Sequence, residues 1–292
     1  MPEPPVAAAV TAPARPRVGG GLARRDAAEL LDQPGHDAAE LAANLRDIRR
    51  VNRLGGGTRT TLRYLPRLLA AVPTNRPVVV LDLATGSADI PLALVAWARR
   101  RGRALRVIAS DASPEILAVA AARVAGHPEI ELAHHDARTV PLPDGGVDIV
   151  LCALALHHFP PDEAVAVLRE MNRLGRYGFV LNDIRRSRLG HAAAWASSRA
   201  GTRNRLTLHD MPLSVLRAYT PAELEDLLAR AGIADAAVTT HPLFRMAAVK
   251  PSAFSDQLSA VSSQRSAVGS GLPEMRDRPP TVADRSRLNA DG

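Results

Sequence analysis

Strands and helices alternate along the middle of this 292-residue sequence, from residue 76 to residue 250. Helical stretches separate five apolar runs that have the length of buried strands: 77–83, 105–110, 130–133, 147–156 and 178–183. Because parallel strands need long crossover connections, which helices provide, this alternation predicts an α/β fold with a mostly parallel sheet. Two more strands, near 236–240 and 244–249, are separated by a short link, which predicts a C-terminal antiparallel hairpin in a seven-stranded sheet.

Three further segments flank this α/β domain. Residues 23–75 carry three helical patterns, of which the first covers 24–32. The second pattern has apolar residues at helical spacing: Leu41, Leu45, Ile48 and Val51. We name residues 23–75 the N-terminal helical cap, and we expect it to cover either the ligand cleft or an edge of the sheet. Residues 1–22 and 251–292 are rich in Pro, Ala, Gly, Ser or Arg and lack apolar periodicity, so we expect both to be disordered.

Composition and charge exclude several classes of protein. The net charge is +7, but the positive side chains are spread along the chain and only 3% of residues are aromatic, so nucleic acid is not the expected partner. The single cysteine, Cys152, excludes internal disulfides and cysteine-based zinc sites, and we expect no metal site. No apolar run approaches the ~20 residues of a membrane span, and the N-terminus does not resemble a signal peptide, so the expected location is the cytoplasm. The sequence carries no signal of an oligomeric state.

Polar side chains gather where the predicted strands end, which is the edge at which open α/β sheets bind ligands. In strand order they are Asp82, Thr85, Gly86, Ser87 and Asp89; Asp111; Asp136; His157 and His158; and Asn182 and Asp183. Asp111 follows Gly86 at about the spacing at which a carboxylate meets the ribose hydroxyls of a nucleoside on the first loop. A carboxylate there favours an adenosine with free hydroxyls, as in NAD or S-adenosylmethionine. Asp148 opens the fourth strand at the opposite end, and we expect it to be structural.

The first loop, Asp-Leu-Ala-Thr-Gly-Ser-Ala-Asp at 82–89, distinguishes between these two ligands. A pyrophosphate needs a G-x-G-x-x-G loop with free amides at a helix N-terminus, whereas this loop has one glycine, Gly86. Asp89 also brings negative charge to the start of the helix, which repels a pyrophosphate and is compatible with an ammonium and a sulfonium. The loop therefore favours S-adenosylmethionine.

Three segments carry a resemblance to a known family. "VVVLDLATGSADIP" is similar to a first motif of the form D/E-x-G-x-G-x-G, with alanine at 84 and 88. "VIASDASPEIL" and "HHDARTVPLPDGGVDIVLCALALHHF" are similar to its second acidic motif and to its adenine-contacting segment with the fourth strand. Residues 76–185 thus resemble a class I S-adenosylmethionine-dependent methyltransferase. The branch they resemble most methylates ubiquinone and menaquinone precursors. The order of elements along the whole chain is closer still to bacterial methyltransferases associated with polyketide and other secondary-metabolite pathways.

The resemblance implies a Rossmann-like fold, S-adenosylmethionine as the cofactor and a set of cofactor-binding residues. Asp82 and the turn around Gly86 would position the methionine part, Asp111 would hold the ribose hydroxyls, and Asp136 would face the adenine amino group. The complete expected set is Asp82, Ala84, Thr85, Gly86, Asp111, Ala112, Asp136, Ala137 and Ala153.

Methyl transfer to a hydroxyl is assisted by a base that removes the proton of the acceptor. His157 and His158 follow the fourth strand, beside the expected methyl group, and either is a candidate base. His209, next to Asp210 on an expected loop between helices, is a further candidate. The predicted function is methyl transfer to a small molecule, at a hydroxyl or carbon of an aromatic, quinone-like or polyketide-derived compound.

Other functions fit the sequence less well. A short-chain oxidoreductase needs a Tyr-x-x-x-Lys pair, whereas Lys250 is the only lysine and Met246 precedes it by four positions. A nucleic-acid methyltransferase usually has an Asn/Asp-Pro-Pro-Tyr signature where this chain has "LALHHFPP". A non-catalytic module that binds S-adenosylmethionine or another nucleoside, with a regulatory or scaffold role, remains the alternative, since methyl transfer has no obligatory catalytic residue.

Overall fold

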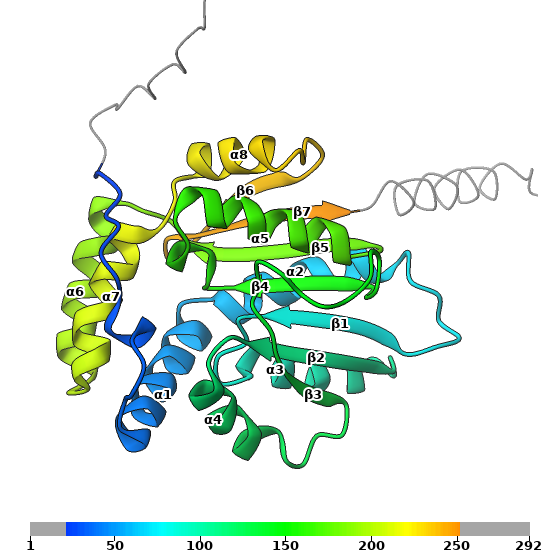
Figure 1. Ribbon diagram of the computed structural model, residues 1–292, viewed down its shortest axis with the longest axis horizontal. Helices are drawn as coiled ribbons and strands as arrows, with labels where there is room; N and C mark the ends of the chain where they lie inside the picture. The colour runs from blue at the N-terminus through cyan, green and yellow to red at the C-terminus, as the bar shows by residue number, and fades with distance from the viewer. Residues whose placement is uncertain (1–21, 252–292) are drawn as a thin grey trace, which may run out of the picture.

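Seven strands form one mixed sheet in the order β3-β2-β1-β4-β5-β7-β6 (Figure 1). The computed structural model describes residues 22–251, so the predicted disorder of 1–22 and 251–292 falls almost entirely outside the described residues. The strands are β1 (Val78–Leu83), β2 (Leu105–Asp111), β3 (Ile130–His134), β4 (Ile149–Ala153), β5 (Gly178–Ile184), β6 (Ala237–His241) and β7 (Arg245–Pro251). The first five are mutually parallel, and β7 pairs antiparallel with both β5 and β6. The predicted fold class is therefore confirmed, and Pro251 belongs to a strand rather than to the C-terminal tail.

Helices cover both faces of this sheet (Figure 1). They are α1 (Ala38–Leu54), α2 (Gly57–Leu69), α3 (Asp89–Arg99), α4 (Pro114–Val124), α5 (Pro161–Leu174), α6 (Arg188–Gly201), α7 (Arg205–Arg217) and α8 (Pro221–Arg230), with 3-10 turns η1 (Leu30–Asp32) and η2 (Leu156–His158). Alternate side chains of β4 enter opposite cores, because successive strand residues point to opposite faces. Ile149 and Leu151 pack with α2, α3 and α4, whereas Val150 and Cys152 pack with α5 and α8.

The N-terminal helical cap covers both the cleft and the sheet. Helix α2 lies on the sheet, where Asn182 of β5 donates hydrogen bonds to the carbonyl of Gly57 (3.0 Å) and to Thr61 Oγ1 (3.2 Å). Helix α1 lies beyond the carboxyl ends of the strands, together with the α6–α7 pair (Figure 1). Helix α1 thus covers the cleft as one expectation had it, whereas α2 packs on the interior strands β4, β5 and β7 and not on an edge of the sheet.

The predicted helix at 24–32 is wrong, because only the single turn η1 forms there. The backbone N–H groups of Leu30 and Leu31 donate to the Asp210 carboxylate of α7, at 2.8 and 2.9 Å. Arg24 donates to the carbonyl of Phe159 at 3.0 Å. Tertiary partners therefore fix this segment in an extended path, which the local sequence pattern does not reveal.

The fourth strand is shorter than the predicted 147–156. It ends at Ala153 because Leu154 has a φ of +58°, a left-handed conformation that breaks the ladder. The apolar run continues into η2 as a buried turn, and this turn carries His157 and His158.

Asp148 joins the amino ends of β1 and β4, away from the cleft. Its carboxylate is 2.6 and 2.7 Å from two nitrogens of Arg76 and accepts the N–H of Val79 at 2.8 Å. The side chain of Asp148 is 3% exposed, whereas that of Arg76 is 35% exposed.

We expect Asp148→Ala to lower the free energy of unfolding by about 2–3 kcal/mol. The value lies below that of a fully buried pair because water partly screens Arg76. Urea unfolding followed by circular dichroism measures it. Asp144→Ala, a change at a side chain that is 84% exposed, is the control and should stay within about 0.5 kcal/mol of the wild type. Equal stability of the two variants would contradict a structural role for Asp148.

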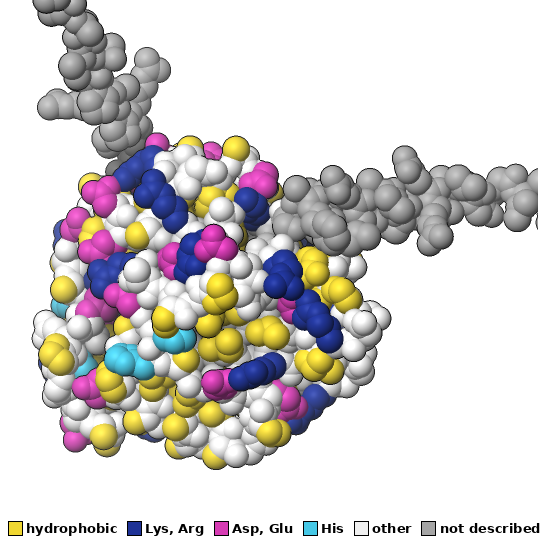
Figure 2. Space-filling model, turned by 45° about the vertical axis from the view of Figure 1, so that its right-hand side comes forward, with side chains coloured by type: hydrophobic (Ala, Val, Ile, Leu, Met, Phe, Trp, Pro, Cys, Tyr) yellow, Lys and Arg dark blue, Asp and Glu magenta, His cyan; other side chains and the backbone are white. Residues whose placement is uncertain are grey.

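Arginine is paired with acidic side chains over much of the surface. Arg99 contacts Glu129 at 2.7 Å, and Arg173 contacts Glu170 at 2.7 Å. The face in Figure 2 shows dark blue and magenta side chains side by side rather than one continuous basic stripe. That nucleic acid is not a partner stays a prediction. Among residues 22–251, no helix has the length and hydropathy needed to cross a membrane.

Candidate functional site

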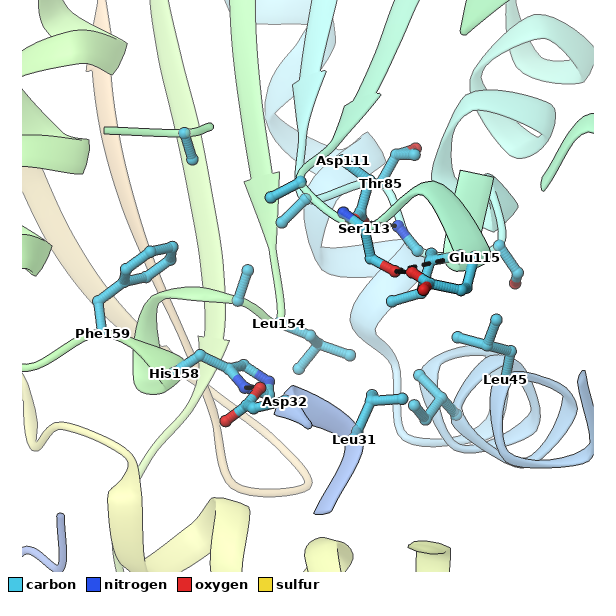
Figure 3. A pocket seen from close by; sticks show the side chains of 18 of the residues that line it. Leu31, Asp32, Leu45, Thr85, Asp111, Ser113, Glu115, Leu154, His158 and Phe159 are labelled. Atoms are coloured by element: carbon cyan, nitrogen blue, oxygen red, sulfur yellow. Dashed lines mark hydrogen bonds and ion pairs between the residues drawn. The ribbon is translucent and has the colours of Figure 1, made fainter. Parts of the chain in front are cut away.

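A cavity of about 910 Å³ lies at the carboxyl ends of β1, β2 and β4. We name it the first cavity. Its size falls in the range of small-molecule sites. The structure brings to its wall all nine residues expected to bind a cofactor: Asp82, Ala84, Thr85, Gly86, Asp111, Ala112, Asp136, Ala137 and Ala153. Figure 3 shows Thr85, Asp111 and Ser113 on one side of a cavity, with Leu45 of α1 beside Glu115.

The loop from β1 to α3 adopts a left-handed backbone at three alternate positions. The φ angles are +51° at Ala84, +57° at Gly86 and +57° at Ala88, a region that favours glycine. These are the three glycine positions of the D/E-x-G-x-G-x-G pattern, so two alanines here occupy a conformation made for glycine. The methyl group of Ala88 is fully buried in the core with α3, and Ala88 is absent from the described lining of the cavity. Alanine at 88 therefore leaves the cavity open.

Replacing these alanines by glycine tests the strain of the loop. Ala84→Gly should raise the free energy of unfolding by up to about 1 kcal/mol, because relief of the left-handed strain exceeds the added entropy of the unfolded chain. Ala88→Gly should be less favourable by about 0.8 kcal/mol, since it also removes a buried methyl group. Thermal unfolding shows which of the two variants is more stable. An Ala88→Gly variant that is more stable than Ala84→Gly would contradict this account.

Three carboxylates face the first cavity from its floor. Asp82 Oδ2 accepts the hydroxyl of Thr85 at 2.6 Å, whereas its Oδ1 is buried with no hydrogen-bond partner. Burial, together with the nearby Asp89 and Asp111, raises the pKa of Asp82 to about 7. Burial likewise raises the pKa of Asp89, which accepts from Asn52 Nδ2 at 2.7 Å. Such a set of underpartnered carboxylates fits a cationic ligand.

Asp111 links the first loop to the second. Its Oδ2 accepts the N–H of Gly86 at 3.0 Å, and its Oδ1 accepts the N–H of Ser113 at 3.1 Å. Burial raises the pKa of Asp111 although these two amides oppose the shift. Each carboxylate oxygen keeps a further lone pair, so the group can accept two more hydrogen bonds from a diol.

Asp136 lies at the rim, where Arg138 Nε donates to its Oδ1 at 2.9 Å and lowers its pKa. The sequence did not identify the apolar wall opposite, which consists of Leu31, Leu41, Leu45, Ile48 and Leu154. The helical spacing of Leu41, Leu45 and Ile48 indicated that one face of α1 is apolar, but it did not show which surface of the protein this face covers.

A second cavity, of about 590 Å³, adjoins the first between α1, α6, α7 and the start of β7. We name it the second cavity. Both cavities are lined by Leu31, Ile48, Leu154 and His158. The second cavity is further lined by a set of apolar side chains: Val51, Leu54, Ile184, Met211, Val215, Leu243 and Phe244.

The two neighbouring histidines of η2 differ in position. His157 is 4% exposed and lines the second cavity, and its Nδ1 lies 2.8 Å from Asp183 Oδ1. His158 lines both cavities, and its Nδ1 lies 2.8 Å from Asp32 Oδ1 (Figure 3). Burial lowers the pKa of His158, but the nearby Glu29 and Asp32 outweigh it and raise the pKa to about 9. His158 therefore has a proton to lose before it can act as a base at neutral pH.

His209 is not on a loop, as the sequence predicted, but within α7. Its side chain is 48% exposed, its Nδ1 lies 2.7 Å from Asp210 Oδ1, and it is not among the described residues that line either cavity. That His209 acts as a base stays a prediction, and the position of its ring outside the described lining of both cavities argues against it.

Known proteins share the central part of this chain. Residues 80–178 match the family model described as a methyltransferase domain. Demethylmenaquinone methyltransferase of Thermus thermophilus is 31% identical over 99 residues, which cover 34% of this chain and 43% of that protein. The enzyme of the same name from Lysinibacillus sphaericus is 35% identical over 98 residues, 34% of this chain and 40% of that protein. The match thus spans less than half the length of either relative.

A solved structure extends the similarity to the fold. A SAM-dependent methyltransferase from Aquifex aeolicus aligns with 74% of this chain and 98% of its own, at a TM-score of 0.51 and 18% sequence identity. Residues 80–178 are thus similar to a methyltransferase domain and to two demethylmenaquinone methyltransferases, and the fold is that of an S-adenosylmethionine-dependent methyltransferase.

Proposed function

We propose that this protein transfers the methyl group of S-adenosylmethionine to a small molecule held in the second cavity. The observation that carries the proposal is the contact between the two cavities at His158 and Leu154, because the first cavity holds the carboxylates at the strand ends and the second offers a mostly apolar surface beside them. When bound, S-adenosylmethionine supplies a methyl group that is already activated by its sulfonium. The protein then has to align the acceptor with that group and to exclude water.

The residues of the first cavity fit this cofactor by their chemistry. Asp111 offers lone pairs for the two ribose hydroxyls, and Asp136 with Ala137 borders the expected adenine position. The unpartnered Oδ1 of Asp82, with Asp89 nearby, suits an ammonium group. Ala153, at the end of β4, lines the floor.

Cofactor affinity should depend on pH through Asp82, whose pKa is about 7. A cationic ligand favours the ionised carboxylate, so below this pKa the bound state requires loss of a proton. We expect the affinity for S-adenosylmethionine to rise about five- to tenfold between about pH 6 and pH 7.5, a range in which an α-amino group with a pKa of about 7.7–8.0 stays mostly charged. Calorimetric titration measures this, and Asp82→Asn should flatten the profile. A profile that is already flat in the wild type would contradict the assignment.

The second cavity supports an aromatic, quinone-like or polyketide-derived acceptor, because most of the surface that it offers is apolar, with polar side chains such as His157 and Ser214 among the lining residues. For a hydroxyl acceptor, the proton must leave during the transfer. The ring of His157 borders this cavity and is oriented by Asp183, the arrangement of a base with its positioning carboxylate. A carbon acceptor, such as an enol carbon, would use the same geometry.

The test is a transfer assay preceded by a binding measurement. S-adenosylhomocysteine should bind with micromolar affinity, and radiolabelled methyl groups should move from S-adenosylmethionine to members of a panel of hydroxylated aromatic and quinol compounds. Binding without transfer to any member would favour the non-catalytic alternative. Absence of binding would reject both.

A further inference from the structure

Two imidazoles and a carboxylate meet where the cavities join. His157 Nε2 lies 3.8 Å from Glu29 Oε1, and His158 Nε2 lies 3.8 Å from Glu29 Oε2. The three ligand atoms all lie within 4.8 Å of one another. Glu29 is 2% exposed and His157 is 4% exposed, so these are buried polar groups that face one another.

The separations do not fit direct hydrogen bonds. At 3.8 Å, each nitrogen–oxygen pair is too far apart for one. Two ligands at about 2.0–2.1 Å from one tetrahedral ion are about 3.3–3.4 Å apart. The three ligand atoms lie within 4.8 Å of one another, so each side chain would have to move by up to about 0.7 Å to bring all three to one ion.

The opposite edge of each ring is already fixed. His157 Nδ1 lies 2.8 Å from Asp183 Oδ1, and His158 Nδ1 lies 2.8 Å from Asp32 Oδ1. A carboxylate can only accept, so each Nδ1 carries the proton that it donates, and the lone pair for a metal ion is on Nε2. In His158 a metal ion would have to displace the second proton that this ring carries at neutral pH. This carboxylate–imidazole arrangement orients metal-binding histidines and raises their basicity. Glu29 is held in turn by Ser214, whose hydroxyl donates to Oε1 at 2.8 Å.

We propose that Glu29, His157 and His158 bind a divalent transition-metal ion. Two nitrogens and one oxygen suit Zn²⁺ and its neighbours, and three protein ligands leave a coordination position open. All three residues line the second cavity, and His158 also lines the first. An acceptor bound at the open coordination position would therefore lie in the second cavity, next to the first cavity.

The role of this site in catalysis rests on the proposed function. An acceptor hydroxyl bound at the open position has a lowered pKa and releases its proton to solvent. The oxygen then forms a bond to the methyl carbon, the carbon–sulfur bond breaks, and its electron pair stays on sulfur as the neutral thioether. The metal changes no oxidation state, and in this form the imidazoles act as ligands rather than as bases.

Metal binding can be tested without cofactor or acceptor. Zn²⁺ titrated by calorimetry into the full-length, chelator-treated protein at neutral pH should bind at one site. Glu29→Gln, which keeps the size of the side chain, should weaken the affinity at least 100-fold. Asp183→Asn should weaken it 10- to 100-fold through the orientation of His157. His209→Gln is the matched control, because it removes an imidazole with a similar carboxylate contact outside both cavities, and it should leave the affinity unchanged.

Two further measurements make the outcome decisive. Co²⁺ bound at the site should show visible absorption bands of nitrogen coordination in the wild type that are lost in Glu29→Gln, and far-ultraviolet circular dichroism establishes that the variant is folded. A wild type that binds no Zn²⁺, or a folded Glu29→Gln variant that binds it as tightly, overturns the proposal. Titration of S-adenosylhomocysteine into the same samples reports on the first cavity separately, so the failure of one proposal is distinguishable from the failure of the other.

Discussion

Asp111→Asn is expected to weaken the binding of S-adenosylhomocysteine by about 100-fold or more. In the proposed complex the carboxylate accepts two ribose hydroxyls while it holds the amides of Gly86 and Ser113. Hydrogen bonds to a charged acceptor contribute about 1.5–3 kcal/mol each, so the loss of two exceeds 100-fold. The asparagine side chain also has an NH₂ group in place of one carboxylate oxygen. This group cannot accept a hydrogen bond from a backbone N–H or from a ribose hydroxyl. Calorimetric titration gives the dissociation constants directly.

The control for this variant is Glu131→Gln. Glu131 lies on the neighbouring strand β3 and is 54% exposed, and it does not line the first cavity among the described residues. It should bind S-adenosylhomocysteine as the wild type does. Less than a threefold loss in Asp111→Asn would mean that the ribose does not lie against this carboxylate.

His157→Gln should lower the rate of methyl transfer by about 100-fold or more while the affinity for S-adenosylhomocysteine changes less than twofold. Removing a base or a metal ligand that acts on the acceptor has effects of this size. The split follows from position, because His157 borders the second cavity and not the first. Steady-state turnover and calorimetry on the same preparation measure the two quantities.

His209→Gln again serves as the control and should keep full turnover. Unchanged turnover in the His157→Gln variant would mean that this residue of η2 takes no part in methyl transfer. If both turnover and cofactor affinity fell together, His157 would act on the shape of the cavities rather than on the acceptor.

The fold class and the gathering of the cofactor-binding candidates at one edge of the sheet could be predicted from sequence because their signals are local. Asp82, Gly86 and Asp111 follow strands at spacings that a parallel sheet brings to one edge. The second cavity could not be predicted, because its parts come from distant segments that meet only in three dimensions. Glu29, on an extended segment that resembled a helix, contacts Ser214 of α7, and no periodicity within either segment encodes that contact.

The two cavities are built from different parts of the chain, and this has a consequence for how the sequence can evolve. The nine expected cofactor residues all lie within the matched span 80–178, whereas most of the second cavity comes from α1, α6, α7 and β7, outside it. Substitutions that change the acceptor can therefore accumulate without disturbing the methyl donor. The preference of a relative for its own acceptor does not transfer with the shared span, and we expect an exchange of α6 and α7 to change the acceptor while the affinity for the methyl donor stays the same.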